Sequence, residues 1–448
     1  MPSTLTIPSI FHDPYDDDNG IEAIRVRAKR LVFWDSSDVR QWFFERGFNL
    51  YVRPEQRCRR ACEDYKPITA PQKPCPPVAF AEEPYPYAYH GEHRDDNDEV
   101  VLTAEDTSGR ILYAQDVDGR HVVFKLAQTD TDEVRIARMI NSLDLEVIRS
   151  NCILPVLDIL EIDERFSFIV MPRWSDTNLD RLCSDDKDIL RLIHGLLKAL
   201  VFLHQRRIVH RDIKIGNTLV NYFTGSPAPV VFPLPPLVEG HTHILEHAIM
   251  DFNISFIAPP TADVRTYRRS YRLAWAGTPP QPNDIWQGEF EYNPFAFDVG
   301  CMGVMFCDYF QAFCPHIPIL APLLDRMTTR DVEKRCTAEE ALAFFEELIG
   351  QYPATGWRYP LSQRTGMVAH GVSYDEYDRW KDLPADFVTR WSHFREPPIP
   401  RTVRVMRWLY ERDRWDILPR VRWFFHHFHR CTFGVLLGWV PIYRKWVA

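Results

Sequence analysis

The chain has 448 residues, an apolar content of 45% and a net charge of −9. The length predicts one large domain with extensions, and the negative charge argues against nucleic acid as the main partner. Ten cysteines show no disulfide framework, and the first eight residues hold no basic and apolar signal region, so we expect an intracellular, cytoplasmic protein.

Residues 1–98 differ in composition from the rest of the chain. Acidic and polar runs at 16–20 and 92–98 and a proline-rich stretch at 67–87 indicate an extension with a semi-extended linker, the alternative being a proline-rich ligand for another protein. The aromatic residues of 21–52 predict a small helical segment that packs on the main domain. Three cysteines of the extension cluster without the fourth ligand of a structural zinc site: Cys58, Cys62 and Cys75.

The next segments predict a hairpin followed by a helix. Residues 104–114 contain one glycine, Gly109, and residues 116–119 have the composition of a hairpin turn. The apolar run 122–125 then reads as a buried strand that ends in Lys125; an ordinary surface lysine is the alternative. Residues 130–140 predict a helix, with a cap at Asp130 or Thr131, acids in the first turn, and apolar residues at helical spacing.

Residues 210–217, His-Arg-Asp-Ile-Lys-Ile-Gly-Asn, bring three polar groups onto one short loop between an apolar helical run and a strand-like run. Phosphoryl transfer needs an acid near the attacking hydroxyl, a cation near the moving phosphoryl group and an oxygen ligand for magnesium. Asp212, Lys214 and Asn217 supply all three, so this loop predicts a phosphoryl-transfer site.

Two segments downstream complete this region. Residues 222–247 are too rich in proline for a central strand, which predicts a looped-out insertion between two strands. Residues 249–253, Ile-Met-Asp-Phe-Asn, place an acid, Asp251, after two apolar residues. A metal site in this insertion is the alternative, and it would use three histidines: His241, His243 and His247. Only the spacing of these histidines supports it, and no cysteine is near.

The last part of the chain predicts helices and a tail of different composition. In 335–342, Thr337 has the position of a helix cap, and Glu340 completes a capping box. Residues 351–448 are rich in Trp, Tyr and Arg, and the apolar run 431–443 is too short for a membrane span. We favour packing of this tail on the main domain or on a partner, and attachment to a membrane surface is the alternative.

These segments, in this order, resemble the landmarks of the eukaryotic protein kinase superfamily, of the serine/threonine type. Residues 210–217 resemble H-R-D-x-x-x-x-N, 122–125 resemble the V-A-I-K strand, 249–253 resemble D-F-G, and 335–342 resemble the closing R-x-T-A-x-E-A-L. The resemblance implies an α+β, two-lobed fold with a small β-rich N-lobe and a larger helical C-lobe. The implied boundaries are 1–98 for the N-terminal extension, 99–171 for the N-lobe, 172–350 for the C-lobe with its insertion at 222–247, and 351–448 for the C-terminal extension.

The resemblance also implies ATP and Mg²⁺ as cofactors and a protein substrate. It makes Lys125 the grip on the α- and β-phosphates, with Glu133 as its partner and Asp132 as the alternative partner. It makes Asp212 the acceptor of the hydroxyl proton and Lys214 the cation that neutralises the γ-phosphoryl group. Four further residues belong to the implied site, two as magnesium ligands and two beside the nucleotide: Asn217, Asp251, Gly109 and Met171.

Further roles are implied by the same resemblance. Asp298 would anchor the catalytic loop, and Arg335 would pair with an acid, for which Asp284 fits better than the segment 280–281. Arg211 implies control by a phosphate on the activation segment, and Gly277–Thr278 matches the serine/threonine type of substrate loop. The candidate phosphorylation sites are Thr266, Tyr267, Ser270 and Tyr271.

The chain departs from the family pattern at three places: the glycine-rich loop keeps only Gly109, Asn253 replaces the glycine of D-F-G, and no A-P-E occurs. Ser108 and Arg110 are candidates to replace the lost phosphate contacts, and Asn253 tolerates the left-handed backbone of a turn. A pseudokinase that binds nucleotide or protein is therefore the alternative function. A small-molecule phosphotransferase is a third reading, which the long activation segment argues against.

Overall fold

The computed structural model describes most of the chain, in two compact units. The first unit comprises residues 1–177 and 218–250, and the second comprises 178–217 and 251–448. The described residues are 4–12, 21–53, 68–72, 85–91, 94–95, 98–99, 102, 104–106, 108–177, 179, 183, 185–224, 245–277, 280–286, 289–357, 373–412, 417, 420–421 and 424.

The first unit is built on an antiparallel five-stranded sheet in the order β1-β7-β8-β10-β9. The predicted hairpin turn joins β7 to β8: Asp116 N donates to Arg120 O over 2.9 Å, and Gly119 has a φ of 81°. The strands are β1 (Asn49–Leu50), β7 (Ile111–Gln115), β8 (His121–Gln128), β9 (Asp158–Glu161) and β10 (Phe166–Pro172).

One face of this sheet is covered by the N-terminal extension, as its aromatic residues predicted. Because side chains alternate along a strand, Phe124 of β8 and Phe168 of β10 point to the same face. They pack there against Trp34 and Phe43, although the neighbouring Phe44 is 63% exposed. The covering elements are η1 (Ser9–Phe11), α1 (Ile21–Trp34) and α2 (Ser37–Phe44).

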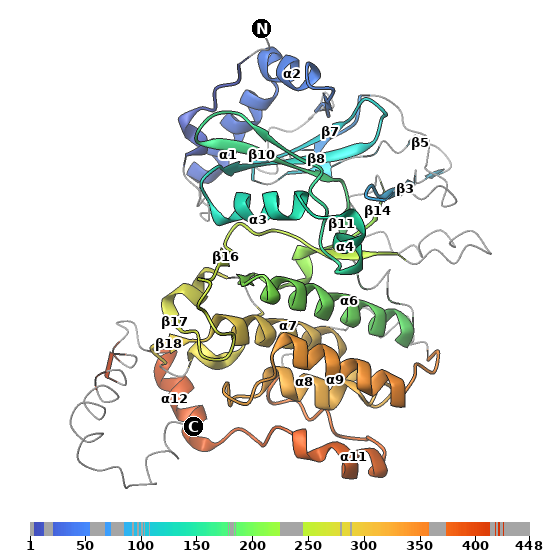
Figure 1. Cartoon of the computed structure of the whole chain (residues 1–448), viewed down its shortest axis with the longest axis vertical. Helices are drawn as coiled ribbons and strands as arrows, with labels where there is room; N and C mark the ends of the chain where they lie inside the picture. Colours follow the sequence, from blue (N-terminus) through green and yellow to red (C-terminus); the bar gives the residue numbers. More distant parts are fainter. Residues whose placement is uncertain are drawn as a thin grey trace. The chain divides into compact units, whose positions relative to one another are not determined.

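Lys125 has the opposite parity to Phe124 and therefore belongs to the other face, where helix α3 (Asp132–Asn141) contacts β8, β9 and β10 (Figure 1). Thr131 stands at the N-cap position of α3, but its hydroxyl donates to Gln128 O instead of capping the helix. Helix α4 (Leu145–Ser150) comes next, capped by the Asp144 side chain.

Smaller sheets complete the first unit. In the order β11-β13-β15, the antiparallel pairing of β13 with β15 brackets the predicted insertion, of which residues 225–244 lie outside the described part. Strands β3 and β14 pair in parallel, and β2 with β6 and β4 with β5 pair antiparallel. The bounds are β2 (Ile68–Thr69), β3 (Tyr89–Gly91), β4 (Arg94–Asp95), β5 (Asp98–Glu99), β6 (Ala104–Glu105), β11 (Ser175–Asp176), β13 (Thr218–Val220), β14 (Tyr222–Thr224) and β15 (His247–Ile249).

The second unit is mainly helical, with α7 packed on α6 and α8, and α9 packed on both α6 and α8 (Figure 1). The predicted capping box of Thr337 and Glu340 is present at the start of α9. The helices are α6 (Asp186–Gln205), α7 (Pro294–Phe310), α8 (Leu320–Thr328), α9 (Ala338–Gln351), α11 (Ala385–Trp391) and α12 (Arg401–Tyr410).

Short elements connect these helices. Strands β12 and β16 pair with each other, as do β17 and β18. Their bounds, with those of the 3₁₀ helices, are β12 (Ile208–Val209), η2 (Ile215–Asn217), β16 (Phe256–Ile257), β17 (Arg269–Ser270), η3 (Tyr271–Ala276), η4 (Asn283–Trp286), β18 (Glu291–Tyr292), η5 (Gln311–Phe313) and η6 (Ser392–Phe394).

The C-terminal extension packs on the second unit only in part. Arg379 is buried and donates to Asp325 Oδ1 over 2.8 Å, whereas Val405, Trp408 and Leu409 of α12 are 55%, 53% and 39% exposed. These three side chains are therefore not buried on the main domain, and packing on a partner, the other form of the expectation, stays a prediction. The apolar run 431–443 lies outside the described residues.

The six cysteines that the structure describes are free thiols, and five of them are buried. Within the described ranges no helix is long and apolar enough to cross a membrane, and no three metal-binding side chains come together. The cysteine cluster at 58–75 and two of the three candidate histidines, 241 and 243, fall outside those ranges. The third, His247, is largely buried, and burial lowers its pKa to about 4.

Candidate active site

The first unit joins the lysine of β8 to the first turn of α3. Lys125 Nζ lies 2.5 Å from Glu133 Oε1, and both side chains are largely buried, at 17% and 12% exposure. The alternative partner, Asp132, forms an ion pair with Arg135 instead. Met171, expected beside the adenine, lies near the end of β10, partly buried against the apolar cluster that contains Trp174.

The turn before β7 contains one glycine, Gly109, whose backbone conformation and close neighbours disfavour a side chain. Gly109 has a φ of 69°, and a Cβ there would lie 3.0 Å from Arg30 Cβ. Ser108 and Arg110, predicted as replacement phosphate contacts, already bind within the first unit: Ser108 Oγ donates to Asp106 Oδ1, and Arg110 Nη2 donates to Phe11 O. Burial raises the pKa of the Asp106 carboxyl, and hydrogen bonds from this turn oppose that rise.

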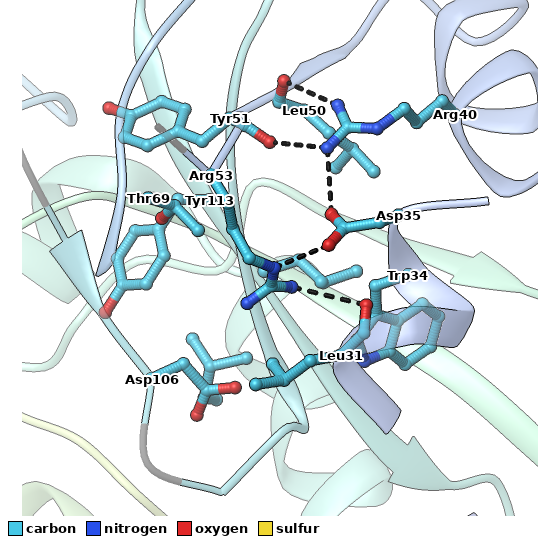
Figure 2. A pocket seen from close by; sticks show the side chains of 12 residues that line it. Leu31, Trp34, Asp35, Arg40, Leu50, Tyr51, Arg53, Thr69, Asp106 and Tyr113 are labelled. Atoms are coloured by element: carbon cyan, nitrogen blue, oxygen red, sulfur yellow. Dashed lines mark hydrogen bonds and ion pairs between the residues drawn. The ribbon is translucent and has the colours of Figure 1, made fainter. Parts of the chain in front are cut away.

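A small cavity lies beside this turn, between the N-terminal extension and the sheet (Figure 2). It encloses about 20 Å³, which is close to the space that one water molecule needs. Two buried polar atoms at its lining residues lack a hydrogen-bond partner in the described structure, Arg53 Nη1 and Asp106 Oδ2. Neither Lys125 nor Glu133 lines this cavity, so it is distinct from the predicted nucleotide contacts.

In the second unit, the loop at 210–217 brings its three predicted functional residues together. Lys214 Nζ lies 2.9 Å from Asp212 Oδ2. Asn217 Nδ2 donates to Asp212 O over 2.8 Å and to Asp212 Oδ2 over 2.9 Å. With its nitrogen used in this way, Asn217 has its amide oxygen left to offer a ligand, and oxygen is the atom that Mg²⁺ prefers.

Asp298 of α7 holds this loop from within the second unit, as the sequence predicted. Its carboxylate accepts His210 N over 2.7 Å and Arg211 N over 2.9 Å, and its side chain is fully buried. His204 of α6 adds a ring nitrogen at 3.2 Å. These contacts hold Arg211 at a φ of 69°, a backbone conformation that a residue with a side chain adopts at a cost of about 1–3 kcal/mol.

In the segment Asp251–Asn253, the left-handed backbone conformation lies two residues before the position where it was expected. The left-handed backbone falls on Asp251, with a φ of 69°, and Asn253 is not among the described residues of positive φ. The prediction that Asn253 would adopt the left-handed conformation of the glycine it replaces is therefore wrong. Asn253 N instead donates weakly to Asp251 Oδ1 over 3.4 Å, and Phe252 packs on His210.

The Arg211 guanidinium is already bound by two backbone carbonyls of the segment that follows Asp251. Its Nη1 donates to Ile254 O over 2.8 Å, and its Nη2 donates to Leu273 O. Of the candidate phosphorylation sites, Tyr271 is buried, Tyr267 is half-buried, and Thr266 and Ser270 are exposed. Thr278 lies outside the described residues, and a Cβ at Gly277 would collide with Arg211 O.

The acid predicted for Arg335 is the one that the structure places there. Asp284 accepts two hydrogen bonds of 2.7 Å from the Arg335 guanidinium, and the side chains are 9% and 0% exposed. The alternative at 280–281 does not fill this position.

Other contacts of the second unit were not predicted. Ser255 Oγ donates to His210 O, and Arg207, with a φ of 60°, donates to Ala262 O. Only the Ser255 contact reaches the loop at 210–217, and no local sequence pattern marks either contact.

Comparison with known proteins gives short stretches of similarity to serine/threonine protein kinases. The chain is 29% identical over 152 residues to mitogen-activated protein kinase kinase 7 of Arabidopsis thaliana, covering 34% of this chain and 41% of that protein. It is 24% identical over 158 residues to a probable serine/threonine-protein kinase of Dictyostelium discoideum, covering 28% and 25%. It is 36% identical over 62 residues to a serine/threonine-protein kinase of Cercopithecine herpesvirus 9, covering 13% and 18%.

These stretches span less than half the length of each of the three relatives, and no protein-family model matches the chain. The mixed α+β structure is compatible with a kinase-like fold. Together, the partial similarities support a protein-kinase-like relationship.

Proposed function

We propose that the chain is an ATP-dependent protein kinase that transfers a phosphoryl group to serine or threonine hydroxyls of protein substrates. The observation that carries this proposal is the convergence of an acid, a cation and an amide on one loop, with Lys214 and Asn217 both within 2.9 Å of Asp212 Oδ2. The names of the partial relatives, all serine/threonine kinases, support the same class of reaction.

Each matched residue has a chemical role in this proposal. Asp212 orients the substrate hydroxyl and accepts its proton, and Asn217 fixes the carboxylate in place. Lys214 neutralises the charge of the transferred group. Lys125, held by Glu133, binds the α- and β-phosphates of ATP.

Magnesium fits the oxygen atoms that two other residues carry. In this proposal Asp251 offers a carboxylate and Asn217 its amide oxygen, and these are the ligand types that Mg²⁺ prefers. When bound, the ion would supply positive charge to the phosphate oxygens. We also propose an intracellular site of action, which the free cysteines support because a reducing compartment keeps thiols unpaired.

The test is phosphoryl transfer from Mg²⁺-ATP to serine- and threonine-containing protein substrates, with analysis of the phosphorylated amino acid. Asp212→Asn should slow transfer by about 10²- to 10⁴-fold, because a general base is lost, while nucleotide binding remains. Equal transfer by the wild-type protein and Asp212→Asn would refute this role of Asp212.

A pseudokinase is the second candidate, and the turn at 106–110 favours it. The side chains of Ser108 and Arg110 are used inside the first unit, which leaves them fewer donors to replace the lost glycines as phosphate contacts. Nucleotide binding without transfer, by both the wild-type protein and Asp212→Asn, would favour this candidate over the enzyme.

A further inference from the structure

In the described part of the turn at 106–110, the backbone N–H groups of Ser108 and Arg110 are used by the turn itself. Ser108 N and Ser108 Oγ both donate to Asp106 Oδ1 over 2.8 Å. Arg110 N donates in turn to Ser108 Oγ over 3.0 Å. Glycine-rich loops bind phosphates through N–H groups of this kind, so a turn whose N–H groups serve its own side chains presents fewer of them to a ligand.

The carbonyl groups of the same turn are held by helix α1. Arg30 Nη1 donates to Ser108 O over 3.0 Å, and Trp34 Nε1 donates to Gly109 O over 2.8 Å. Arg30 and Trp34 are 0% and 1% exposed; the Trp34 bond is buried, and the Arg30 bond is partly buried. The two residues are four apart, which places them on one face of α1.

The segment before α1 is tied to the same place. Arg30 Nε and Nη2 both donate to Ile10 O, over 3.0 and 2.8 Å, and Arg110 Nη2 donates to Phe11 O over 3.1 Å. Arg30 therefore links the chain at residue 10 to the turn at residue 108. A lysine at this position has no planar fork of donors and would not make all of these bonds.

The far end of the turn is bonded to the strand that carries Lys125. Arg110 O accepts Leu126 N over 3.0 Å, and Ile111 stands opposite Lys125 in the ladder between β7 and β8. Hydrogen bonds thus run continuously from α1 through the turn to the neighbour of the lysine.

We propose that Arg30 and Trp34 are positioning residues of the nucleotide site, which act through the turn Asp106–Arg110 on the strand of Lys125. This inference rests on the proposed ATP binding by Lys125. The N-terminal extension holds this turn in one conformation, where a typical kinase has a flexible glycine-rich loop. Phosphate recognition is then left mainly to side chains.

The test compares two tryptophan variants of the full-length protein. Trp34→Phe removes the N–H donor to Gly109 O and keeps an aromatic ring. Trp42→Phe is the matched control, because Trp42 is also buried in the N-terminal extension and packs on Phe43 and Phe168. We expect Trp34→Phe to weaken Mg²⁺-ATP binding about three- to tenfold, by loss of a buried hydrogen bond, and Trp42→Phe to leave it within about twofold of wild type.

Two further measurements separate positioning from general loss of stability. In Trp34→Phe, the KM for ATP should rise while the KM for the protein substrate stays constant, and hydrogen exchange at Arg110 and Leu126 should speed up. Arg30→Lys, which keeps the charge, should show the same pattern, so the proposal stays testable if one variant fails to fold.

The outcomes distinguish this inference from the proposed function. If the wild-type protein binds ATP and neither Trp34→Phe nor Arg30→Lys weakens binding more than Trp42→Phe does, the positioning role is wrong and the kinase proposal stands. If the wild-type protein binds no nucleotide, the proposed function itself fails, and the positioning role fails with it.

Discussion

At the scale of single residues, the second unit depends on a buried charge that has one partner side chain. Arg335 is fully buried; burial alone would lower the pKa of its guanidinium, but the charge and hydrogen bonds of Asp284 outweigh burial and raise it. Gly300 is part of the same arrangement, because a Cβ there would lie 2.6 Å from Arg335 Nη1. The Arg335 guanidinium is therefore held by close packing against Gly300 as well as by the charge of Asp284.

We predict that Asp284→Asn lowers the unfolding free energy of the second unit by about 3–5 kcal/mol, because it leaves a buried charge without its counterion. Urea denaturation at neutral pH measures this change. The control is Asp331→Asn, whose partner Lys334 is 81% exposed and whose loss should therefore cost far less than that of Asp284. Similar losses in both variants would contradict the buried-pair interpretation.

At the scale of elements, three strands of the first unit carry histidines in apolar surroundings. Burial lowers the pKa of His90 on β3 to about 4 and that of His247 on β15 to about 4. Burial, then the nearby His90 and Arg173, lower the pKa of His121 on β8 to about 3. Each histidine is therefore neutral in the folded protein at a pH where the unfolded chain, with a pKa of 6.5, becomes protonated.

Protonation of the unfolded chain sets the sign of the resulting pH dependence. Below pH 6.5 the unfolded chain binds more protons than the folded unit, so stability falls as the pH falls toward 4. We predict a loss of about 1–2 kcal/mol per histidine between pH 7 and pH 5 in the unfolding free energy of the first unit. Denaturant titrations at the two pH values measure it.

The matched variant for this prediction is His90→Phe, since His90 is stacked on Phe223 and a phenyl ring keeps that contact. The difference between pH 7 and pH 5 should shrink in this variant, whatever its absolute stability. Two carboxyls of the same unit, Asp106 and Asp176, have pKa values raised by burial and act in the opposite direction. An unchanged difference in His90→Phe would show that His90 is not responsible.

Short-range patterns in the sequence predicted the local features well. The hairpin turn at 116–119 and the capping box at 337–340 depend on residues only a few positions apart, and both are present. The ion pair between Arg335 and Asp284 was also predicted correctly. The closing motif identified Arg335, and the need for a negative charge favoured Asp284 as its partner.

Contacts between distant residues could not be predicted in this way. Trp34 bonds to Gly109 across 75 positions, and Arg30 to Ser108 across 78, and no local pattern encodes either bond. The same holds for Arg211, whose charge was assigned to a phosphate but whose donors bind two backbone carbonyls. The left-handed residue of 251–253 was misplaced because residue type alone was considered, without the backbone around it.

At the scale of the whole molecule, the proposed function predicts stabilisation by nucleotide that depends on magnesium. A ligand present at about 100 times its Kd stabilises the folded state by about 2.7 kcal/mol. We predict that ATP raises the midpoint of thermal unfolding more in the presence of Mg²⁺ than in its absence. A thermal-shift titration of the full chain measures both conditions.

Asp251→Asn is the matching variant, since it removes a proposed magnesium ligand and keeps the size of the side chain. The additional shift caused by Mg²⁺ should disappear in this variant and persist in Asp331→Asn. Equal shifts by ATP with and without Mg²⁺ in the wild-type protein would count against metal-assisted nucleotide binding.

The buried cysteines of the second unit have a practical consequence. Burial raises the pKa of the Cys307 thiol to about 12 and that of Cys336 to about 11, and thiolate is the form that reacts with alkylating reagents. Iodoacetamide should therefore modify these sulfurs only in molecules that have opened. The rate of alkylation, followed by mass spectrometry, therefore measures how often the helical core opens, and no label has to be introduced into the protein.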